Sequence, residues 1–442
     1  MQQRPMSRRR TVSTVLAAAG LVVTGLTAAE PANAAQPSIS ISSTNSYPGS
    51  PARVVVRAVD GSGHAIRGAK VMVTYPGQGG QRVYTNTSGQ AVANFTQRAG
   101  ISAYHVYVWL PGSSSVSTQA SLRSQGVHQH FPRSTARLVH QVGAYSVPSY
   151  DDIRNASSAG VHLLQNGSSD VRLRTLASQS GSSVLDGRLY RAVYDTLCNL
   201  STRKCRTATC ADLAHIAALT RQIASSAAGR APATAGWQIL DDYMWASFRS
   251  ALATQKKALR SVGDAKPIVC AFGLHLALRN NAKDAQASLA AFKNTLTNYS
   301  SQWCDAVMLY SYPPGRSRYI PSSAYDWSLS TILPTALKLL RAAGWNPGIS
   351  PMIESPATFG FNPRVIPGSK QVSYQPAPTD AELAQEIDAY AALGAASVMG
   401  YAWDDGSTGP RPGSIQLMMN SARLRADLTA DANSARSKYW RF

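Results

Sequence analysis

The first part of the chain alternates apolar and polar side chains with the two-residue period of β-strands. Five such segments lie between turn residues: SISIS (38–42), ARVVVRAVD (52–60), AKVMVTY (69–75), QAVANFT (90–96) and AYHVYVWL (103–110). The Ser-rich stretch PGSSSVSTQASLRSQG follows them and is interpreted as the edge of the domain. The pattern predicts an all-β domain over residues 36–125, and nothing in it indicates catalysis.

After this edge the pattern changes, and short apolar runs alternate with helical stretches to the end of the chain. The eight runs are HQVGAYSV (140–147), GVHLLQNG (160–167), SSVLDG (182–187), GWQILDD (236–242), PIVCAFG (267–273), DAVMLYSYP (305–313), GISPMIES (348–355) and ASVMGYAWDDG (396–406). Eight apolar strands, each followed by a helix, predict a closed (β/α)8 barrel, an α/β fold, over residues 130–442.

Two of the intervening helices are well marked in the sequence. The apolar residues between Leu329 and Leu340 recur at helical spacing and form a single face. A second helix begins with a capping box from Thr379 to Glu382 and ends at Gly394. The third strand has the weakest pattern of the eight, and a long loop with several cysteines follows it.

Residues 1–34 have the layout of a secretory signal peptide. MQQRPMSRRR is a basic start, TVLAAAGLVVTGLTAA is an apolar run too short to span a membrane, and ANA precedes the expected cleavage after Ala34. Arg8 and Arg9 resemble a twin-arginine signal, but Thr11 stands where that pattern has a large apolar residue, so both export routes stay open. We expect a secreted, soluble protein without membrane insertion.

The net charge of the chain is strongly positive, at +20, and no single run of Lys or Arg accounts for it. A positive field spread over the surface favours an anionic partner, such as an acidic polysaccharide or a charged cell wall. We expect no nucleic-acid partner. A basic secreted protein without a charged partner is the alternative interpretation.

Five cysteines lie at positions 198, 205, 210, 270 and 304. In an oxidising compartment the cluster Cys198, Cys205 and Cys210 predicts one disulfide, although its spacing does not decide which pair forms and an odd cysteine is left over. With His215 the cluster offers a notional zinc set, but its spacing matches no zinc module. We therefore expect no metal and no cofactor.

The active site of a (β/α)8 barrel is built at the carboxyl ends of its strands. The polar and aromatic residues at these predicted ends are Tyr145, Gln165, Asn166, Asp186, Asp241, Asp242, Phe272, His275, Tyr310, Tyr312, Glu354, Trp403, Asp404 and Asp405. Carboxylates and amides bind sugar hydroxyls, and flat rings stack on the apolar faces of pyranoses. The composition of the predicted mouth is therefore typical of a carbohydrate site.

Two resemblances sharpen these expectations. The segment DGSGHAIRGAKVMVTY with TNTSGQAVANF resembles bacterial immunoglobulin-like domains of the invasin type, which implies a β-sandwich that acts as a spacer or adhesion module. The second half resembles the clan of (β/α)8 glycoside hydrolases with the acid/base on strand four and the nucleophile on strand seven. GWQILDD is similar to the strand-four motif of that clan, although Asp242 stands where the clan has glutamate.

The second resemblance implies roles for individual residues. Asp242 is the general acid, with Asp241 in the acidic or amide position before it, and Glu354 is the nucleophile or base. Tyr310 or Tyr312 hydrogen-bonds the nucleophile, and Trp403 is the platform under the sugar. The expected substrate-binding residues are Asp241, Tyr145, Gln165, Asn166, Asp186, Tyr310, Tyr312, Trp403 and Asp404. Glycosidic cleavage needs two carboxyls, one to protonate the leaving oxygen and one to attack or to activate water.

Local chemistry leaves alternatives for several of these carboxylates. Strand neighbours point in opposite directions, so one of Asp241 and Asp242 is structural or caps the next helix. Asp404 and Asp405 precede a glycine and suit a turn, yet either one is the base if Glu354 is not.

The expected function is hydrolysis of a polysaccharide or oligosaccharide by a secreted enzyme. A non-catalytic, glycan-binding barrel displayed on the all-β domain is the rival. A metal-dependent amidohydrolase is set aside, because HQH at 128–130 lies before the first strand and strands five and six lack the required histidines.

Overall fold

The computed structural model of the chain describes most residues after the predicted leader. The described residues are 37–44, 48–49, 51–98, 101–125, 129–199, 204–240, 248–274, 282–311, 328–358, 360–365, 372–375, 377–403, 415–416 and 418–440. They form two compact units, of which the first contains residues 53–95 and 103–124, and the second contains Gln125–Phe442 together with residues 45–52 and 96–102. No helix among these residues combines the length and apolarity that crossing a membrane requires.

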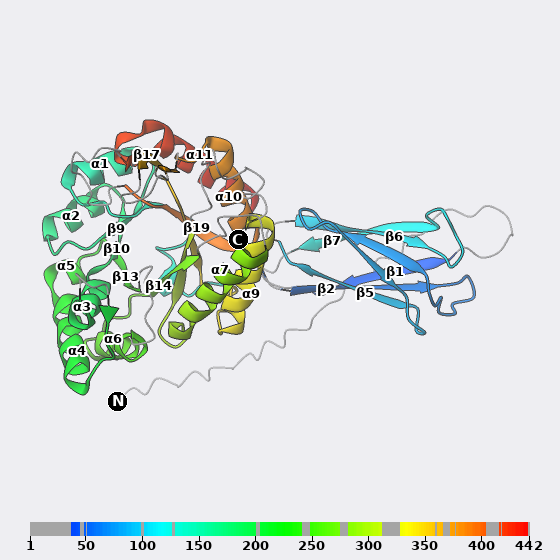
Figure 1. The fold of residues 1–442 in the computed structure, drawn as a ribbon, viewed down its shortest axis with the longest axis horizontal. Coiled ribbons are helices and arrows are strands. Elements are labelled where there is room, and N and C mark those ends of the chain that lie inside the picture. Colours follow the sequence, from blue (N-terminus) through cyan, green and yellow to red (C-terminus); the bar gives the residue numbers. More distant parts are fainter. Residues whose placement is uncertain are drawn as a thin grey trace, which may run out of the picture. The chain divides into compact units, whose positions relative to one another are not determined.

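The first unit consists of two antiparallel sheets (Figure 1). One sheet has the order β1-β2-β5, with β1 at Ser38–Ser43, β2 at Pro51–Val59 and β5 at Gln90–Thr96. The other has the order β4-β3-β6-β7, with strands at Gly80–Tyr84, Lys70–Thr74, Ile101–Trp109 and Thr118–Gln125. Alternate residues of both sheets, such as Val56, Val71 and Val106, form one apolar core.

This unit confirms the predicted all-β domain and corrects it at two strands. β4 was not predicted, and β7 lies in the stretch interpreted as a Ser-rich edge. Ala120 and Leu122 are the β7 residues with described side chains that pack in the core, so the alternation is hidden among polar residues. The name immunoglobulin-like stays a prediction.

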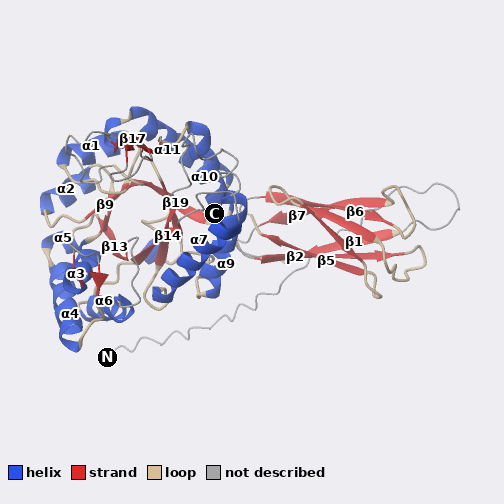
Figure 2. Ribbon diagram, viewed as in Figure 1, coloured by secondary structure: helices blue, strands red, loops and turns tan. Residues whose placement is uncertain are grey.

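The second unit is a closed barrel of eight parallel strands (Figure 2). The strands follow one another around the ring in sequence order: β8 Val142–Ala144, β9 Leu163–Asn166, β10 Ser183–Asp186, β13 Thr234–Leu240, β14 Ile268–Leu274, β15 Ala306–Ser311, β16 Met352–Pro356 and β19 Ala395–Gly400. Each lies within or overlaps one of the eight predicted runs. The fold is therefore an α/β (β/α)8 barrel preceded by an all-β domain, as predicted.

Helices surround the barrel strands (Figure 2). The α-helices of the described part are α1 Tyr150–Ser158, α2 Val171–Gln179, α3 Arg188–Leu197, α4 Cys210–Ser225, α5 Ala227–Arg230, α6 Arg249–Ser261, α7 Ala282–Thr295, α9 Leu333–Ala342, α10 Asp380–Ala392 and α11 Ala422–Lys438. The predicted capping box of Thr379 and Glu382 opens α10, and Gly394 follows its end with a φ of 106°. A π-helical turn, Ser328–Ile332, precedes α9.

Two further elements were not predicted. The segment after β10 contains α3, a hairpin of β11 (Cys198–Asn199) and β12 (Lys204–Cys205), and α4, where we expected a long loop. A small antiparallel sheet of β17 (Gly360–Val365), β18 (Val372–Gln375) and β20 (Ile415–Gln416) was also missed.

Side chains of the barrel strands separate into an inner and an outer set, because successive residues of a strand point to opposite faces. The inner cluster takes residues from strands all around the ring, for example Leu163, Val269 and Met399. The outer clusters pack against helices and contain Val142, Trp237 and Val398. The parity of a residue therefore decides whether it faces the barrel interior or the surrounding helices.

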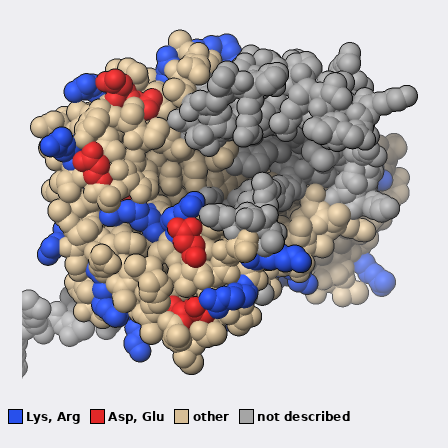
Figure 3. All heavy atoms as spheres, turned by 60° about the vertical axis from the view of Figure 1, so that its left-hand side comes forward, with Lys and Arg blue, Asp and Glu red and all other residues tan. Residues whose placement is uncertain are grey.

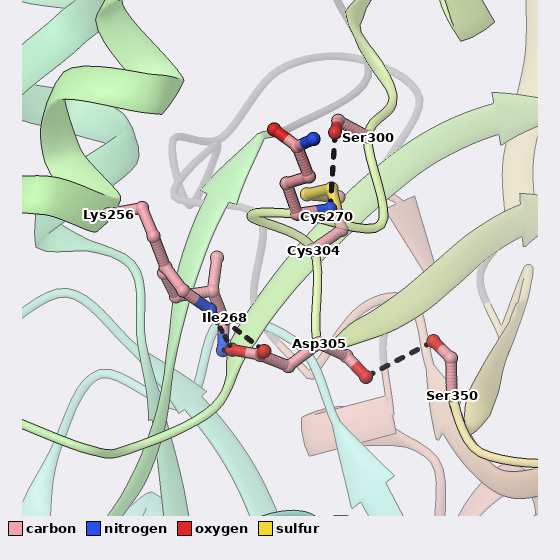
Figure 4. Close-up of a disulfide and its surroundings, with 8 residues drawn as sticks. Lys256, Ile268, Cys270, Ser300, Cys304, Asp305 and Ser350 are labelled. Atoms are coloured by element: carbon pink, nitrogen blue, oxygen red, sulfur yellow. Dashed lines mark hydrogen bonds and ion pairs between the residues drawn. A yellow bond between two sulfur atoms is a disulfide. The ribbon is translucent and has the colours of Figure 1, made fainter. Parts of the chain in front are cut away.

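Two disulfides are present among the described cysteines. Cys198 and Cys205 join β11 to β12, which confirms one disulfide in the predicted cluster. It also removes two of the four notional zinc ligands, because a cysteine in a disulfide has no thiolate. Cys210 is free and exposed. The second disulfide links Cys270 on β14 to Cys304, just before β15 (Figure 4).

The chain beside this second disulfide is held by Asp305 (Figure 4). Its carboxylate accepts hydrogen bonds from Lys256 Nζ at 2.8 Å and from the backbone N–H of Ile268 at 2.9 Å. Its carbonyl oxygen accepts one from the Ser350 hydroxyl at 3.1 Å. Asp305 therefore ties the start of β15 to the start of β14 and to the segment before β16.

We expect the Cys270–Cys304 disulfide to contribute more stability than the Cys198–Cys205 disulfide. The two bonds span 34 and 7 residues, and the entropy removed from the unfolded chain grows with the closed loop, giving roughly 3–4 and about 2 kcal/mol. Urea unfolding of the two double Cys→Ala variants measures the difference, with Cys210→Ala as the control. An equal or larger loss for the shorter loop would contradict this ranking.

Candidate active site at the barrel mouth

Five polar or aromatic side chains gather at the carboxyl ends of the barrel strands. Tyr145 follows β8, Gln165 is on β9, Gln238 on β13, Tyr310 on β15, and Tyr401 follows β19. The three tyrosines belong to or pack against the inner cluster. Because parallel strands end on the same rim of a barrel, these side chains form the floor of its mouth.

The three tyrosine rings contact one another. The Tyr145 and Tyr401 ring centroids are 5.0 Å apart, and Tyr310 lies edge-on to both, at 5.7 Å from Tyr145 and 5.9 Å from Tyr401. Such tilted and edge-to-face contacts are the favoured arrangement of aromatic pairs. Tyr310 is buried, whereas Tyr145 and Tyr401 are half-buried. A ligand can therefore touch the rings of Tyr145 and Tyr401.

Gln238 connects this cluster to strand four. Its Nε2 donates to the Tyr310 hydroxyl at 3.2 Å and to the Leu240 carbonyl oxygen at 3.1 Å, and it lies 3.5 Å from the Tyr145 hydroxyl. Its Oε1 is buried and has no hydrogen-bond partner among the described residues. Buried acceptors without a partner are uncommon in folded proteins, and Gln238 has no exposed surface of its own.

A cavity of about 580 Å³ opens beside Tyr145 and Gln165 and continues to Arg188, Tyr190 and Leu219 on α3 and α4. Gly187 borders it, and a Cβ there would lie 2.5 Å from the Gln165 amide nitrogen. Glycine is therefore required for Gln165 to keep its position. The volume is within the range of sites that hold small ligands or one end of a larger one.

Asp186 does not face this mouth, although it was predicted to bind substrate. It is fully buried on the outer side of β10 and forms ion pairs with Arg174 at 3.1 Å and Arg188 at 2.7 Å. Neighbouring Asn166 is also buried and accepts hydrogen bonds from Arg174 Nη1 and the Ser168 N–H. The polar atoms of both residues therefore bind other residues of the barrel wall, and the structure does not bring either side chain to the mouth.

Glu354 also points away from the mouth, which is at odds with its predicted role as nucleophile. It is register partner of Leu309 on β15 and Val398 on β19, and both belong to the outer clusters. Its neighbour Ile353 belongs to the inner cluster. Side chains that pair in a parallel ladder share a face, so Glu354 lies between the barrel wall and the helices.

The surroundings of Glu354 are unfavourable for a negative charge. The side chain is fully buried, and neither carboxyl oxygen has a hydrogen-bond partner within the described part of the chain. Burial raises its pKa well above the ordinary value, and the charges of Glu386 on α10 and Asp431 on α11 raise the pKa further. Burial therefore favours the neutral form of the Glu354 carboxyl.

Trp403 was predicted as the platform under the sugar, but the structure places its side chain away from the mouth. β19 ends at Gly400, and Trp403 lies in an outer cluster with Met418, with no exposed surface. Its indole N–H donates to Asp152 Oδ1 at 2.8 Å, and the Arg425 guanidinium lies 5.7 Å from its ring. Tyr401, two residues earlier, provides the ring at the mouth instead.

Several predicted residues lie outside the described part of the chain. These are Asp241, Asp242, His275, Tyr312, Asp404 and Asp405, together with the predicted signal peptide. Of the remaining candidates, the structure brings Tyr145, Gln165 and Tyr310 together.

Sequence reasoning missed Gln238 and Tyr401. Gln238 is the one polar residue inside the run GWQIL, and a polar residue in an otherwise buried strand was the available signal. Tyr401 was passed over because the larger ring of Trp403 follows it at the same parity. β19 ends at Gly400, so the alternation of side chains along the strand no longer gives the direction of Trp403.

Figure 3 shows the charged side chains on the described part of one face of the molecule. Lys and Arg side chains are scattered there, and several lie against Asp or Glu. Exposed ion pairs of this kind include Arg191 with Asp195 and Arg154 with Asp151. This agrees with the absence of a long Lys/Arg run in the sequence.

Comparison with known proteins gives matches at the level of the fold. No family model matches the sequence, and no curated protein matches it. Similar solved structures are β-glucuronidases from Ruminococcus gnavus. A complex with C6-substituted uronic isofagomine has a TM-score of 0.42 and 10% identity, covering 90% of this chain and 67% of that chain. The apo structure has a TM-score of 0.41 and 11% identity, covering 91% and 68%. At this similarity no activity follows, so function is argued from the site.

We predict that Glu354→Gln stabilises the protein increasingly as pH rises. A carboxyl whose folded pKa is raised gives its full stability below the unfolded pKa of about 4.3 and loses it as pH rises toward the folded pKa, by up to about 1.4 kcal/mol per pH unit. Urea unfolding between pH 4.5 and 8 measures this difference, and Asp151→Asn is the control because its side chain is 84% exposed. A constant difference between Glu354→Gln and the parent protein would contradict the burial of an acid here.

We predict that Asp186→Asn destabilises the protein by roughly 3–5 kcal/mol, because Arg174 is then left buried without its counter-ion. The matched control is Asp195→Asn, which removes an exposed pair with Arg191 worth about 0–1 kcal/mol. Thermal and urea unfolding measure both variants. A loss for Asp186→Asn no larger than that of the control would show that the buried network is not structural.

Proposed function

We propose that the chain is a secreted glycoside hydrolase that cleaves a polysaccharide at the mouth of its barrel. The observation that carries the proposal is the convergence of Tyr145, Gln165, Gln238 and Tyr401 at the carboxyl end of the strands. Active sites of this fold lie at that end. Export is supported by the leader pattern of residues 1–34.

The chemistry of these side chains supports a sugar as the ligand. Amides and phenol hydroxyls donate and accept hydrogen bonds without carrying charge, which suits the many hydroxyl groups of a pyranose. The half-buried rings of Tyr145 and Tyr401 offer apolar surface to the ring carbons. The cavity along α3 provides room for a neighbouring sugar unit of the same chain.

Hydrolysis also needs carboxyl groups, and the sequence places candidates directly after two strands of the site. Asp241 and Asp242 follow β13, which carries Gln238, and Asp404 and Asp405 follow soon after Tyr401. We propose Asp242 as the general acid. Because Glu354 faces the helices, Asp404 or Asp405 is the proposed base or nucleophile, and this choice leaves retention and inversion open.

Because Glu354 does not face the mouth, the site lacks one of its expected carboxyls. This favours the rival function, a barrel that binds glycan without cleaving it. Such a protein keeps the amides and tyrosines of the mouth and lacks one of the two carboxyls. Both functions require binding of the polysaccharide, whereas only the hydrolase cleaves it. An assay must therefore measure binding and cleavage.

We predict that Asp242→Asn lowers the rate of glycosidic cleavage by roughly 10²–10⁴-fold, the usual contribution of a general acid. The experiment incubates the mature chain with a panel of neutral and acidic polysaccharides and measures new reducing ends. Asp404→Asn and Asp405→Asn identify the second carboxyl. Glu354→Gln is the matched control and keeps the parental rate, because its side chain lies outside the mouth.

Two outcomes would contradict the proposal. Binding of a polysaccharide without turnover across the whole panel would favour the non-catalytic barrel. If Glu354→Gln abolished cleavage while Asp242→Asn stayed active, the catalytic carboxyl would lie on the outer side of β16. The site described above would then be wrong.

A further inference from the structure

The outer face of the four-stranded sheet in the all-β unit carries an ordered set of aromatic and basic side chains. The pairing register places Lys70 between Tyr84 on β4 and Trp109 on β6, and it places Met72 between Arg82 and Tyr107. We call the eight residues Lys70, Met72, Thr74, Arg82, Tyr84, His105, Tyr107 and Trp109 the aromatic face.

These side chains point away from the core of the domain. The alternate residues Val71, Val73, Val106 and Val108 are fully buried in it, whereas Arg82, Tyr84 and His105 are exposed and the other members of the face are half-buried. Tyr84 is 60% exposed, one of the largest values for a big apolar side chain in the described chain. Tyr84 pairs with Lys70, which also pairs with Trp109, so this ring belongs to a contiguous patch and is not an isolated exposed side chain.

The other sheet of the same unit provides an internal comparison. The outward residues of β2 and β5 include Arg53, Arg57, Val92 and Asn94, and none of the three strands of this sheet carries an aromatic ring on its outer side. Both sheets therefore expose arginines, and only one of them combines cations with rings. The aromatic face is a property of one surface and not of the domain as a whole.

Charge supports an anionic partner for this face. Between residues 36 and 125 the sequence has a single acidic residue, Asp60, which lies in the turn after β2. The basic residues of the same range are Arg53, Arg57, Arg67, Lys70, Arg82, Arg98 and Arg123. Lys70 and Arg82 are on the aromatic face, and exposed Arg123 is on β7, the strand next to β6. No carboxylate on this face competes for these cations.

The local packing keeps the rings and cations together. The Lys70 ammonium lies over the Trp109 ring at 4.1 Å from its centroid, an attractive cation–π contact. Next to them, Gly80 leaves room for Met72, since a Cβ at position 80 would lie 2.8 Å from the Met72 sulfur. The middle of the face is therefore filled by flat or adaptable side chains, with the charged group of Lys70 among them.

We propose that the aromatic face binds an anionic polysaccharide, a chain of pyranose rings that carry carboxylate groups. The rings of Tyr84 and Trp109 flank Lys70 on adjacent strands, roughly 9–10 Å apart, so two linked sugar units stack on them while Lys70 and Arg82 bind the carboxylates. This site goes beyond hydrolysis in the barrel: it holds the polymer on the all-β unit.

The test is equilibrium binding of the full mature chain to beads coated with polygalacturonate, with fully methyl-esterified polygalacturonate as the neutral matched probe. We expect Tyr84→Ala/Trp109→Ala and, separately, Arg82→Gln to weaken binding to polygalacturonate by roughly tenfold. Arg57→Gln on the other sheet is the matched control and changes binding less than about twofold. Circular dichroism and thermal unfolding verify that each variant folds, and Arg82→Gln gives an answer even if the aromatic double variant does not.

Three results would overturn the proposal: no binding of the parent protein to polygalacturonate, an equal loss in Arg57→Gln and Arg82→Gln, or tighter binding of a single-stranded oligodeoxynucleotide to the same face. Cleavage of a soluble oligosaccharide is measured on the same variants and is expected to stay unchanged. Failure of this binding site is thereby distinguished from failure of the proposed hydrolase, which the barrel variants test.

Discussion

The alternation of side chains along a parallel barrel strand is the constraint on which the site depends. Each strand has one face toward the barrel interior and one toward the helices, and a shift of one residue exchanges them. On β16 this rule places Ile353 inside and Glu354 outside. On this strand the alternation turns the carboxyl of Glu354 away from the mouth.

The same constraint explains how the wall accommodates buried polar groups. Asp186 is stabilised on the outer face by two guanidinium groups, from Arg174 on α2 and Arg188 on α3. Glu354 has no such partner among the described residues, and burial favours its neutral form. On the inner face, uncharged amides and phenols take the polar positions, and their hydrogen bonds and ring contacts hold one another in place.

Much of the fold could be predicted from the sequence, because strands and helices leave periodic patterns. All eight barrel strands were found from short apolar runs, and the capping box of Thr379 marks α10 correctly. Strands β4 and β7 were missed, because GQRVY and TQASLRSQ contain few apolar residues to set a period.

The direction of single side chains was less predictable. Register shifts interrupt the pairing of β13 with both neighbours and of β16 with β19, so counting back from a strand end does not give the facing side. The partners of Asp186 come from two helices on either side of its strand, which no local pattern indicates.

The most direct measurement of this arrangement is a crystal structure of the chain with a bound oligosaccharide. We expect a sugar hydroxyl within hydrogen-bond distance of the Gln238 side chain and a pyranose ring against Tyr401, with Glu354 separated from the sugar by the barrel wall. A sugar bound with its anomeric carbon or a hydroxyl against the Glu354 carboxyl would contradict the assignment of the inner face as the site.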